Sequence, residues 1–128
     1  MKNRKPRIYI AGGMTGLPNN NWEAFFRKEE ELKLGGWDVV NPARMDKEVG
    51  LDPKNLTEWH YEDCARRDVE VIFTCDAIYM LSGFQFSKGA CWERALAKRL
   101  GLQRYYEVPR ADHEFPRGCG ETGETRQI

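Results

Sequence analysis

The sequence predicts an α/β fold, a Rossmann-like (flavodoxin-like) three-layer sandwich with a four- or five-stranded, mainly parallel sheet. Short apolar segments alternate with helical segments along the chain, which favours a parallel sheet covered by helices on both faces. One of these segments, residues 76–81, reads as a strongly buried strand. The chain has 128 residues, which is enough for one domain with one core.

The first half of this pattern begins with a strand at residues 7–11. The strand turns at Gly12-Gly13 into a long loop that is rich in turn-forming residues. Asn20 or Asn21 can cap the helix that follows, and Gly35-Gly36 ends it. Its mostly apolar face is formed by Trp22, Phe25, Phe26, Glu29 and Leu32.

The second half adds three strands and two helices. We expect strands at residues 37–40, 76–81 and 103–108, and a polar loop at residues 43–55 after the Asn41-Pro42 stop. The expected helices run from a Thr57 cap to about Phe73 and from Ser87 to Leu100. Residues 1–108 therefore form the domain, and residues 109–128 a polar, Gly-rich tail.

Composition argues against several classes of protein. The 20 basic and 20 acidic side chains balance, so no basic field favours duplex nucleic acid. No apolar run approaches the roughly 18 residues that a membrane span needs. The cysteines lack Cys-x-x-Cys spacing, and we interpret them as reduced thiols of a cytoplasmic protein. The chain has only two histidines, which argues against a His-based catalytic dyad or a zinc site. We expect no metal and no cofactor.

Two carboxylates interrupt apolar helix faces. Glu93 shares its face with Gly89, Ala90, Leu96, Ala97 and Leu100, and Asp68 shares one with Tyr61, Cys64, Ala65, Val69 and Ile72. An inward acid is poorly placed for solubility and well placed for chemistry, so a shared cleft is favoured.

Simpler structural roles stay open for some of these acids. Asp68 can instead cap a neighbouring element or pair with an arginine, while Arg67 reads as an ordinary solvated charge. Asp76 has a stronger structural interpretation, because acids often begin strands and cap turns.

The topology places the cleft. A switch point beside the first strand brings the loops at Gly12 and Ser87 together above the carboxyl ends of the first and third strands.

Three features occur together: Tyr9-Ile-Ala-Gly-Gly13 at the first strand, Asp68 in its helix, and the spacing Ser87-x-Gly89-x-x-x-Glu93. Together they resemble the nucleoside 2-deoxyribosyltransferase superfamily. One branch of it is marked by the segments Tyr9-Ile-Ala-Gly-Gly-Met-Thr-Gly16, Val40-Asn-Pro-Ala43, Cys75-Asp-Ala-Ile-Tyr79 and Ser87-Lys-Gly-Ala90, with Glu93. The superfamily includes nucleoside transferases and 2'-deoxynucleoside 5'-monophosphate N-glycosidases, and the chain is most similar to a small branch common in phage and prophage. The resemblance covers about residues 7–102.

This resemblance implies three catalytic roles. Glu93 matches the nucleophile that attacks the anomeric carbon and forms a covalent glycosyl-enzyme. Asp68 matches the acid that contacts the base and can protonate its leaving nitrogen. Tyr9 matches the tyrosine whose hydroxyl orients the nucleophile, although a ring that simply packs in the strand is an equal alternative.

The resemblance also implies a substrate and a set of binding residues. The monophosphate glycosidases carry a serine at the position of Ser87, and the nucleoside transferases carry an acid there. A serine hydroxyl at a helix N-terminus suits a phosphate, and Lys88 adds positive charge, although Ser87 can also be only an N-cap. The implied substrate-binding residues are Gly12, Gly13, Met14, Thr15, Ser87, Lys88 and Gly89.

Two positions depart from the glycosidases, which have an arginine where this chain has Thr15 and a hydroxyl where it has Gly13. The resemblance further implies a homodimer or larger homo-oligomer.

Three functions compete for this cleft. The first is an enzyme that cleaves or exchanges the N-glycosidic bond of a (2'-deoxy)nucleoside 5'-monophosphate or nucleoside. The second is a non-catalytic module that binds a nucleotide or nucleotide-derived signal. Two inward acids favour the enzyme, since a binder of an anionic ligand gains nothing from them. A dinucleotide-binding protein is least favoured, because the run Gly12-Gly-Met-Thr-Gly16 lacks Gly-x-Gly-x-x-Gly spacing.

Overall fold

In the part of the chain that the structure describes, the sheet has four parallel strands in the order β2-β1-β3-β4. The structure, a computed structural model, describes residues 4–54 and 58–108, with side chains for 4–54 and 62–108. The strands are β1 (Arg7–Ala11), β2 (Asp38–Val40), β3 (Ala77–Met80) and β4 (Gln103–Tyr106). This confirms the predicted parallel α/β sandwich, while the expected tail and the Thr57 cap lie outside the described residues.

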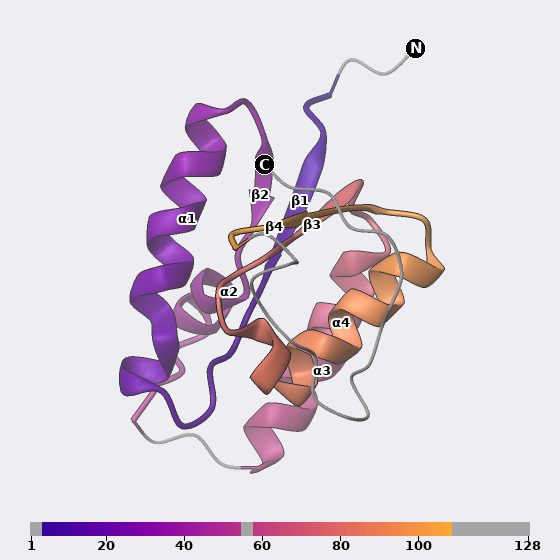
Figure 1. The fold of residues 1–128 in the computed structure, drawn as a ribbon. Helices are drawn as coiled ribbons and strands as arrows, with labels where there is room; N and C mark the ends of the chain where they lie inside the picture. The colour runs from indigo at the N-terminus through magenta and orange to yellow at the C-terminus, as the bar shows by residue number, and fades with distance from the viewer. Residues whose placement is uncertain (1–3, 55–57, 109–128) are drawn as a thin grey trace.

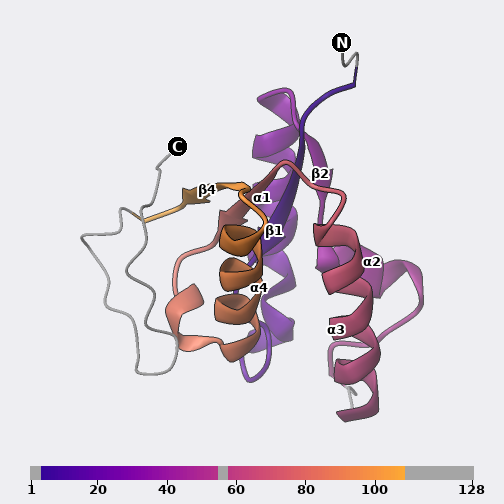
Figure 2. The same ribbon diagram turned by 90° about the vertical axis from the view of Figure 1, so that its right-hand side faces the viewer.

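Three helices form the outer layers (Figures 1 and 2). α1 (Trp22–Leu34) covers one face of the sheet, and α3 (Glu58–Ile72) and α4 (Lys88–Arg99) cover the other. Because side chains alternate along a strand, Ile8 and Ile10 pack toward α1, whereas Tyr9 packs in the core beneath α3 and α4. β3 is buried along its whole length, as a central parallel strand should be.

A further helix, α2 (Pro42–Glu48), occupies part of the region 43–55, so the prediction of a polar loop there is wrong. Asn41 caps it, because its Oδ1 atom accepts a hydrogen bond of 2.9 Å from the Ala43 N–H, and Pro42 fits the first turn. The buried carboxylate of Glu29 on α1 accepts a hydrogen bond of 2.9 Å from Arg44 on α2. Local capping and this contact give a short helix without a long apolar face.

The two ends of α1 differ from each other in how well the sequence predicted them. At the C-terminal end, Gly35 and Gly36 stop the helix as expected, and Gly36 has a φ of 94° that favours glycine. At the N-terminal end, a 3₁₀ turn, η1 (Pro18–Asn21), precedes the helix. Asn21 occupies the N-cap position, but its side chain donates a hydrogen bond of 2.9 Å to the Gly13 carbonyl instead of capping the helix. The expected asparagine side-chain cap is therefore wrong.

The switch point lies between β1 and β3, because β1 has β2 on one side and β3 on the other. Immediately after β1 the chain passes close to the end of β3. A Cβ atom at Gly12 would lie 2.9 Å from the Leu81 side chain, so this passage requires glycine.

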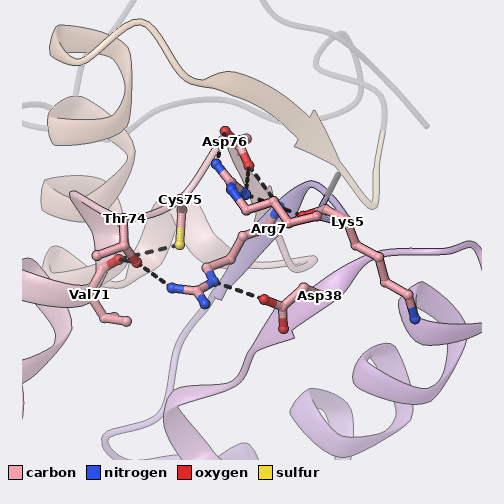
Figure 3. Close-up of polar contacts among 8 residues, drawn as sticks. Lys5, Arg7, Asp38, Val71, Thr74, Cys75 and Asp76 are labelled. Atoms are coloured by element: carbon pink, nitrogen blue, oxygen red, sulfur yellow. Dashed lines mark hydrogen bonds and ion pairs between the residues drawn. The ribbon is translucent and has the colours of Figure 1, made fainter. Parts of the chain in front are cut away.

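The opposite, amino end of the sheet carries a surface cluster of charges (Figure 3). The Arg7 backbone N–H donates a hydrogen bond of 2.8 Å to Asp76, and the Arg7 side chain reaches Asp38 at 3.0 Å and Thr74 at 2.9 Å. Arg4 adds an ion pair of 2.8 Å with Asp76. Asp76 thus ties β1 to the start of β3, which agrees with its structural interpretation.

The cysteines follow the sequence expectation only in part. Cys64 and Cys75 are free thiols, whereas Cys91 is disulfide-bonded, so the expectation of a reduced thiol is wrong at Cys91. Sequence spacing does not limit which cysteines a fold brings within bonding distance. In the part of the chain that the structure describes, no helix is both long enough and apolar enough to cross a membrane.

Candidate functional site

A cavity of about 260 Å³ opens at the carboxyl ends of β1 and β3, at the switch point. Its walls come from the loop after β1 and from the helices α1, α2, α3 and α4. Most of the residues that the sequence suggested line it, namely Tyr9, Gly12, Met14, Thr15, Asp68, Ser87, Gly89 and Glu93. The two inward carboxylates therefore face one cavity, as the shared-cleft argument requires.

Tyr9 and Glu93 are in direct contact. The ring of Tyr9 is fully buried, and its hydroxyl donates a hydrogen bond of 2.8 Å to Oε2 of Glu93. The strand pleat points Tyr9 toward the face covered by α3 and α4, and Glu93 lies in the second turn of α4. Burial raises the pKa of Tyr9 well above its ordinary value, so the hydroxyl keeps its proton and acts as a donor.

Asp68 lies on α3 and is held by an arginine. The Nε and Nη2 atoms of Arg67 donate hydrogen bonds of 3.0 and 2.8 Å to Oδ1 of Asp68. Nη2 of the same guanidinium is 2.8 Å from Oδ1 of Asp46 on α2. Asp68 thus lines the cavity and also pairs with an arginine, and the interpretation of Arg67 as an ordinary solvated charge is wrong.

The two cavity acids have raised pKa values. Desolvation, followed by the charge of Asp68, raises the pKa of Glu93 to about 8, against the Tyr9 hydrogen bond and the charge of Arg67. Desolvation also raises the pKa of Asp68 to about 6, and here the Arg67 charge and hydrogen bonds oppose the rise. Between these pH values the pair of acids holds one proton, mainly on Glu93, while Asp68 is ionised.

Several cavity residues escaped the sequence analysis. Asp46 and Pro42 lie on α2, which was expected to be a loop, and the Asn41-Pro42 cap was the signal that could have revealed it. Asn20 lies in η1, where no periodic pattern marks a site. Cys64 was placed on the inward face of α3 but was not considered as a site residue.

Cys64 is not suited to nucleophilic chemistry. Its thiol donates a hydrogen bond of 3.5 Å to Asp46, and desolvation raises its pKa to about 11. Since the thiolate is the reactive form, Cys64 stays an inert thiol at neutral pH.

A second cavity of about 520 Å³ adjoins the first. The two cavities share Met14, Thr15, Ser87 and Gly89, whereas the predicted binding residues Gly13 and Lys88 line only the second. Ser87 lies between them as the N-cap of α4, and its Oγ accepts a hydrogen bond of 3.1 Å from the Ala90 N–H. The N-cap role of Ser87 is thus confirmed, and its own hydroxyl proton can still be donated.

This arrangement defines the chain as a parallel α/β protein with an acid-lined cavity at its switch point. Residues 6–106 match a domain family of unknown function, DUF4406, and the chain belongs to that family. No curated protein matches the chain. In the described residues, no cluster of three histidine, cysteine, aspartate or glutamate side chains could hold a metal ion.

Proposed function

We propose that the protein cleaves or exchanges the N-glycosidic bond of a (2'-deoxy)nucleoside 5'-monophosphate or nucleoside through a covalent glycosyl-Glu93 intermediate. The observation that carries the proposal is the contact of Glu93 with the Tyr9 hydroxyl in the cavity that Asp68 also lines. Retaining glycosidic chemistry needs two carboxyl groups that flank one reacting bond, and the resemblance assigns these groups to Glu93 and Asp68.

In the first chemical step one bond forms, one bond breaks and one proton is transferred. A carboxylate oxygen of Glu93 attacks the anomeric carbon, the bond from that carbon to the base nitrogen breaks, and its electron pair leaves with the base. A proton from Asp68 reaches the base during departure. The second step reverses these roles: water or a second base attacks the anomeric carbon, its proton returns to Asp68, and Glu93 leaves.

The proposed chemistry and the cavity pKa values place the shared proton on different carboxyl groups. The reaction starts from ionised Glu93 and protonated Asp68, whereas the pKa values place the single proton of the pair mainly on Glu93. Both forms carry the same number of protons, so a ligand that moves the proton from Glu93 to Asp68 creates the reactive form without exchange with solvent. The reactive state is therefore the singly protonated pair.

The preference for a 5'-monophosphate rests on the boundary between the two cavities. Ser87 and Gly89 line both, and Lys88 at the start of α4 lines the outer one. A sugar at Glu93 can thus direct its 5' end toward the Ser87 hydroxyl, the first turn of α4 and the Lys88 ammonium. Lys88 supplies the positive charge that Thr15 lacks relative to the glycosidases.

The test is release of free base from a panel of nucleosides and their 5'-monophosphates, followed by chromatography. We expect the monophosphates to react faster, and Ser87→Asp to reduce that advantage at least tenfold by repulsion. Equal rates for nucleoside and monophosphate would contradict the preference for a 5'-phosphate. If no substrate releases free base, the proposed enzymatic activity is rejected.

A non-catalytic nucleotide-binding module is the second candidate, and the pKa of Glu93 favours it. A carboxyl group with a pKa near 8 is neutral at pH 7 and can donate a hydrogen bond to a ligand. A binder would hold the same nucleotides without releasing base.

A further inference from the structure

Three consecutive asparagines adopt the left-handed backbone conformation. Asn19, Asn20 and Asn21 have φ values of 52°, 56° and 61°, and among the described residues they are the non-glycine positions with positive φ. Left-handed backbone is unfavourable for an ordinary residue, and asparagine tolerates it better than most residues. A run of three at the rim of a cavity is therefore a strained element that the surrounding structure must hold in place.

The three side chains have different surroundings. Asn19 is exposed. Asn21 holds the loop after β1 through its hydrogen bond of 2.9 Å to the Gly13 carbonyl. Asn20 is only 6% exposed and lines the inner cavity, where no described residue shares a hydrogen bond with its carboxamide.

A buried carboxamide without a partner is unfavourable unless something else satisfies it. Its oxygen accepts and its amino group donates, side by side, so its complement is a planar edge with an adjacent donor and acceptor. Nucleobases present such edges, and asparagine binds them through two hydrogen bonds. Phe25 lines the same cavity and offers an apolar surface for a ring.

We propose that Asn20 recognises the nucleobase of the ligand through its carboxamide, and that the left-handed run Asn19–Asn21 holds this group in the cavity. The choice of a nucleobase as ligand rests on the proposed function. The consequence is a trade-off at one residue: the conformation that positions Asn20 for binding costs folding stability.

The test compares Asn20→Gly with Asn19→Gly. Glycine adopts positive φ freely, so both substitutions relieve the same kind of backbone strain, and only the first removes a carboxamide from the cavity. Binding is measured calorimetrically with the four common 2'-deoxynucleoside 5'-monophosphates and the four free bases, in a Glu93→Gln background that prevents turnover. Stability is measured by urea unfolding.

We expect Asn20→Gly to keep or raise the urea midpoint and to weaken binding of the preferred base at least tenfold. Asn19→Gly should match its stability and bind as the parent does. Asn20→Asp keeps the size of the side chain but loses the donor, so it should weaken binding and change the order of preference among the bases. If Asn20→Gly does not fold, the binding affinity and base preference of Asn20→Asp test the proposal.

The outcomes separate this inference from the proposed function. Released base from the starting protein, with parental binding by Asn20→Gly, overturns the inference alone. Nucleotide binding that depends on Asn20, without released base, supports the inference and rejects the enzyme. Absence of binding to every nucleotide and base overturns both.

Discussion

The two ends of the parallel sheet use charged residues in opposite ways. At the amino end, Asp38 and Asp76 are matched by Arg7 and Arg4, and all four side chains are partly exposed. Each carboxylate there has its own guanidinium, and water reaches the pairs. Exposed ion pairs of this kind each contribute little to the free energy of unfolding. The hydrogen bond from the Arg7 backbone N–H to Asp76 contributes in another way, because it fixes the register of β1 against β3.

At the carboxyl end the balance is different. Glu93, Asp68 and Asp46 line one cavity, and the single guanidinium of Arg67 binds two of them. Burial raises the pKa values of Glu93 and Asp68, because the ionised carboxylates lose their hydration. This desolvation lowers the stability of the folded protein. Matched, solvated charges thus organise the structural end of the sheet, and an excess of buried acids marks the end that we propose for chemistry.

The largest effect should come from Glu93→Gln, which removes the charge of the proposed nucleophile but keeps its shape. Turnover should fall by about 10⁴-fold or more, by analogy with other covalent enzymes. A slow 2-fluoro-substituted sugar substrate should leave an adduct on the Glu93 peptide of the starting protein in mass spectrometry. Asp38→Asn at the amino end is the matched control and should leave turnover unchanged. If Glu93→Gln releases base at the normal rate, Glu93 has a structural role only.

The same substitution, Glu93→Gln, should raise the stability of the folded protein while it lowers turnover. Unfolded Glu93 ionises near pH 4.5 and folded Glu93 near pH 8, so between these values the folded protein binds more protons and loses stability as the pH rises. Glu93→Gln removes this loss, and its urea midpoint should exceed that of the parent by an amount that grows from pH 5 to pH 8. A constant difference across this range would show that Glu93 is not desolvated.

The next largest effect is the pH dependence of turnover. Because the reactive state is the singly protonated pair, kcat/KM should be bell-shaped, with apparent pKa values near 6 and 8 that belong to the pair of Glu93 and Asp68. Below the lower value both acids are protonated, and above the upper value both are ionised. A profile that stays flat from pH 5 to pH 9 would contradict the coupled pair.

Two charged neighbours of Asp68 should shift the acidic limb of the pH profile in opposite directions when they are neutralised. The positive charge of Arg67 lowers the pKa of Asp68, whereas the negative charge of Asp46 raises the pKa of Asp68. Tyr9 acts on the other acid of the pair, because its hydroxyl donates a hydrogen bond to Glu93. Arg67→Gln should therefore move the acidic limb to higher pH, by about one unit, and Asp46→Asn should move it to lower pH by less. Shifts in the same direction would show that the variants act through a general disturbance of the cavity.

The sequence predicted those parts of the molecule that follow a helical or strand period. Glu93 and Asp68 were found because they break apolar stripes. Tyr9 was singled out by the family resemblance, and the alternation of faces along β1 explains why its ring lies on the side of Glu93. The parallel sheet and its switch point followed from the order of the elements.

The missed features depend on contacts that no period encodes. α2 has only seven residues and is defined by the Asn41 cap and its contact with α1. Arg67 lies on the flank of α3, but its long side chain reaches across to Asp46. Asn20 has a backbone conformation that tertiary structure imposes, so its position in the cavity could not be read from its neighbours in the chain.

The smallest effect should come from the amino end, and it concerns stability alone. Asp76→Ala removes the acceptor of the Arg7 N–H, and we expect a loss of about 1 kcal/mol in the free energy of unfolding. Arg4→Ala removes only the exposed partner of Asp76 and should leave stability nearly unchanged. Both variants should retain full turnover, since Asp76 precedes β3 at the end of the sheet opposite to Glu93. A loss of turnover in Asp76→Ala, measured well below its unfolding temperature, would mean that the register set at the amino end controls the cavity. The separation of a structural end from a chemical end would then be wrong.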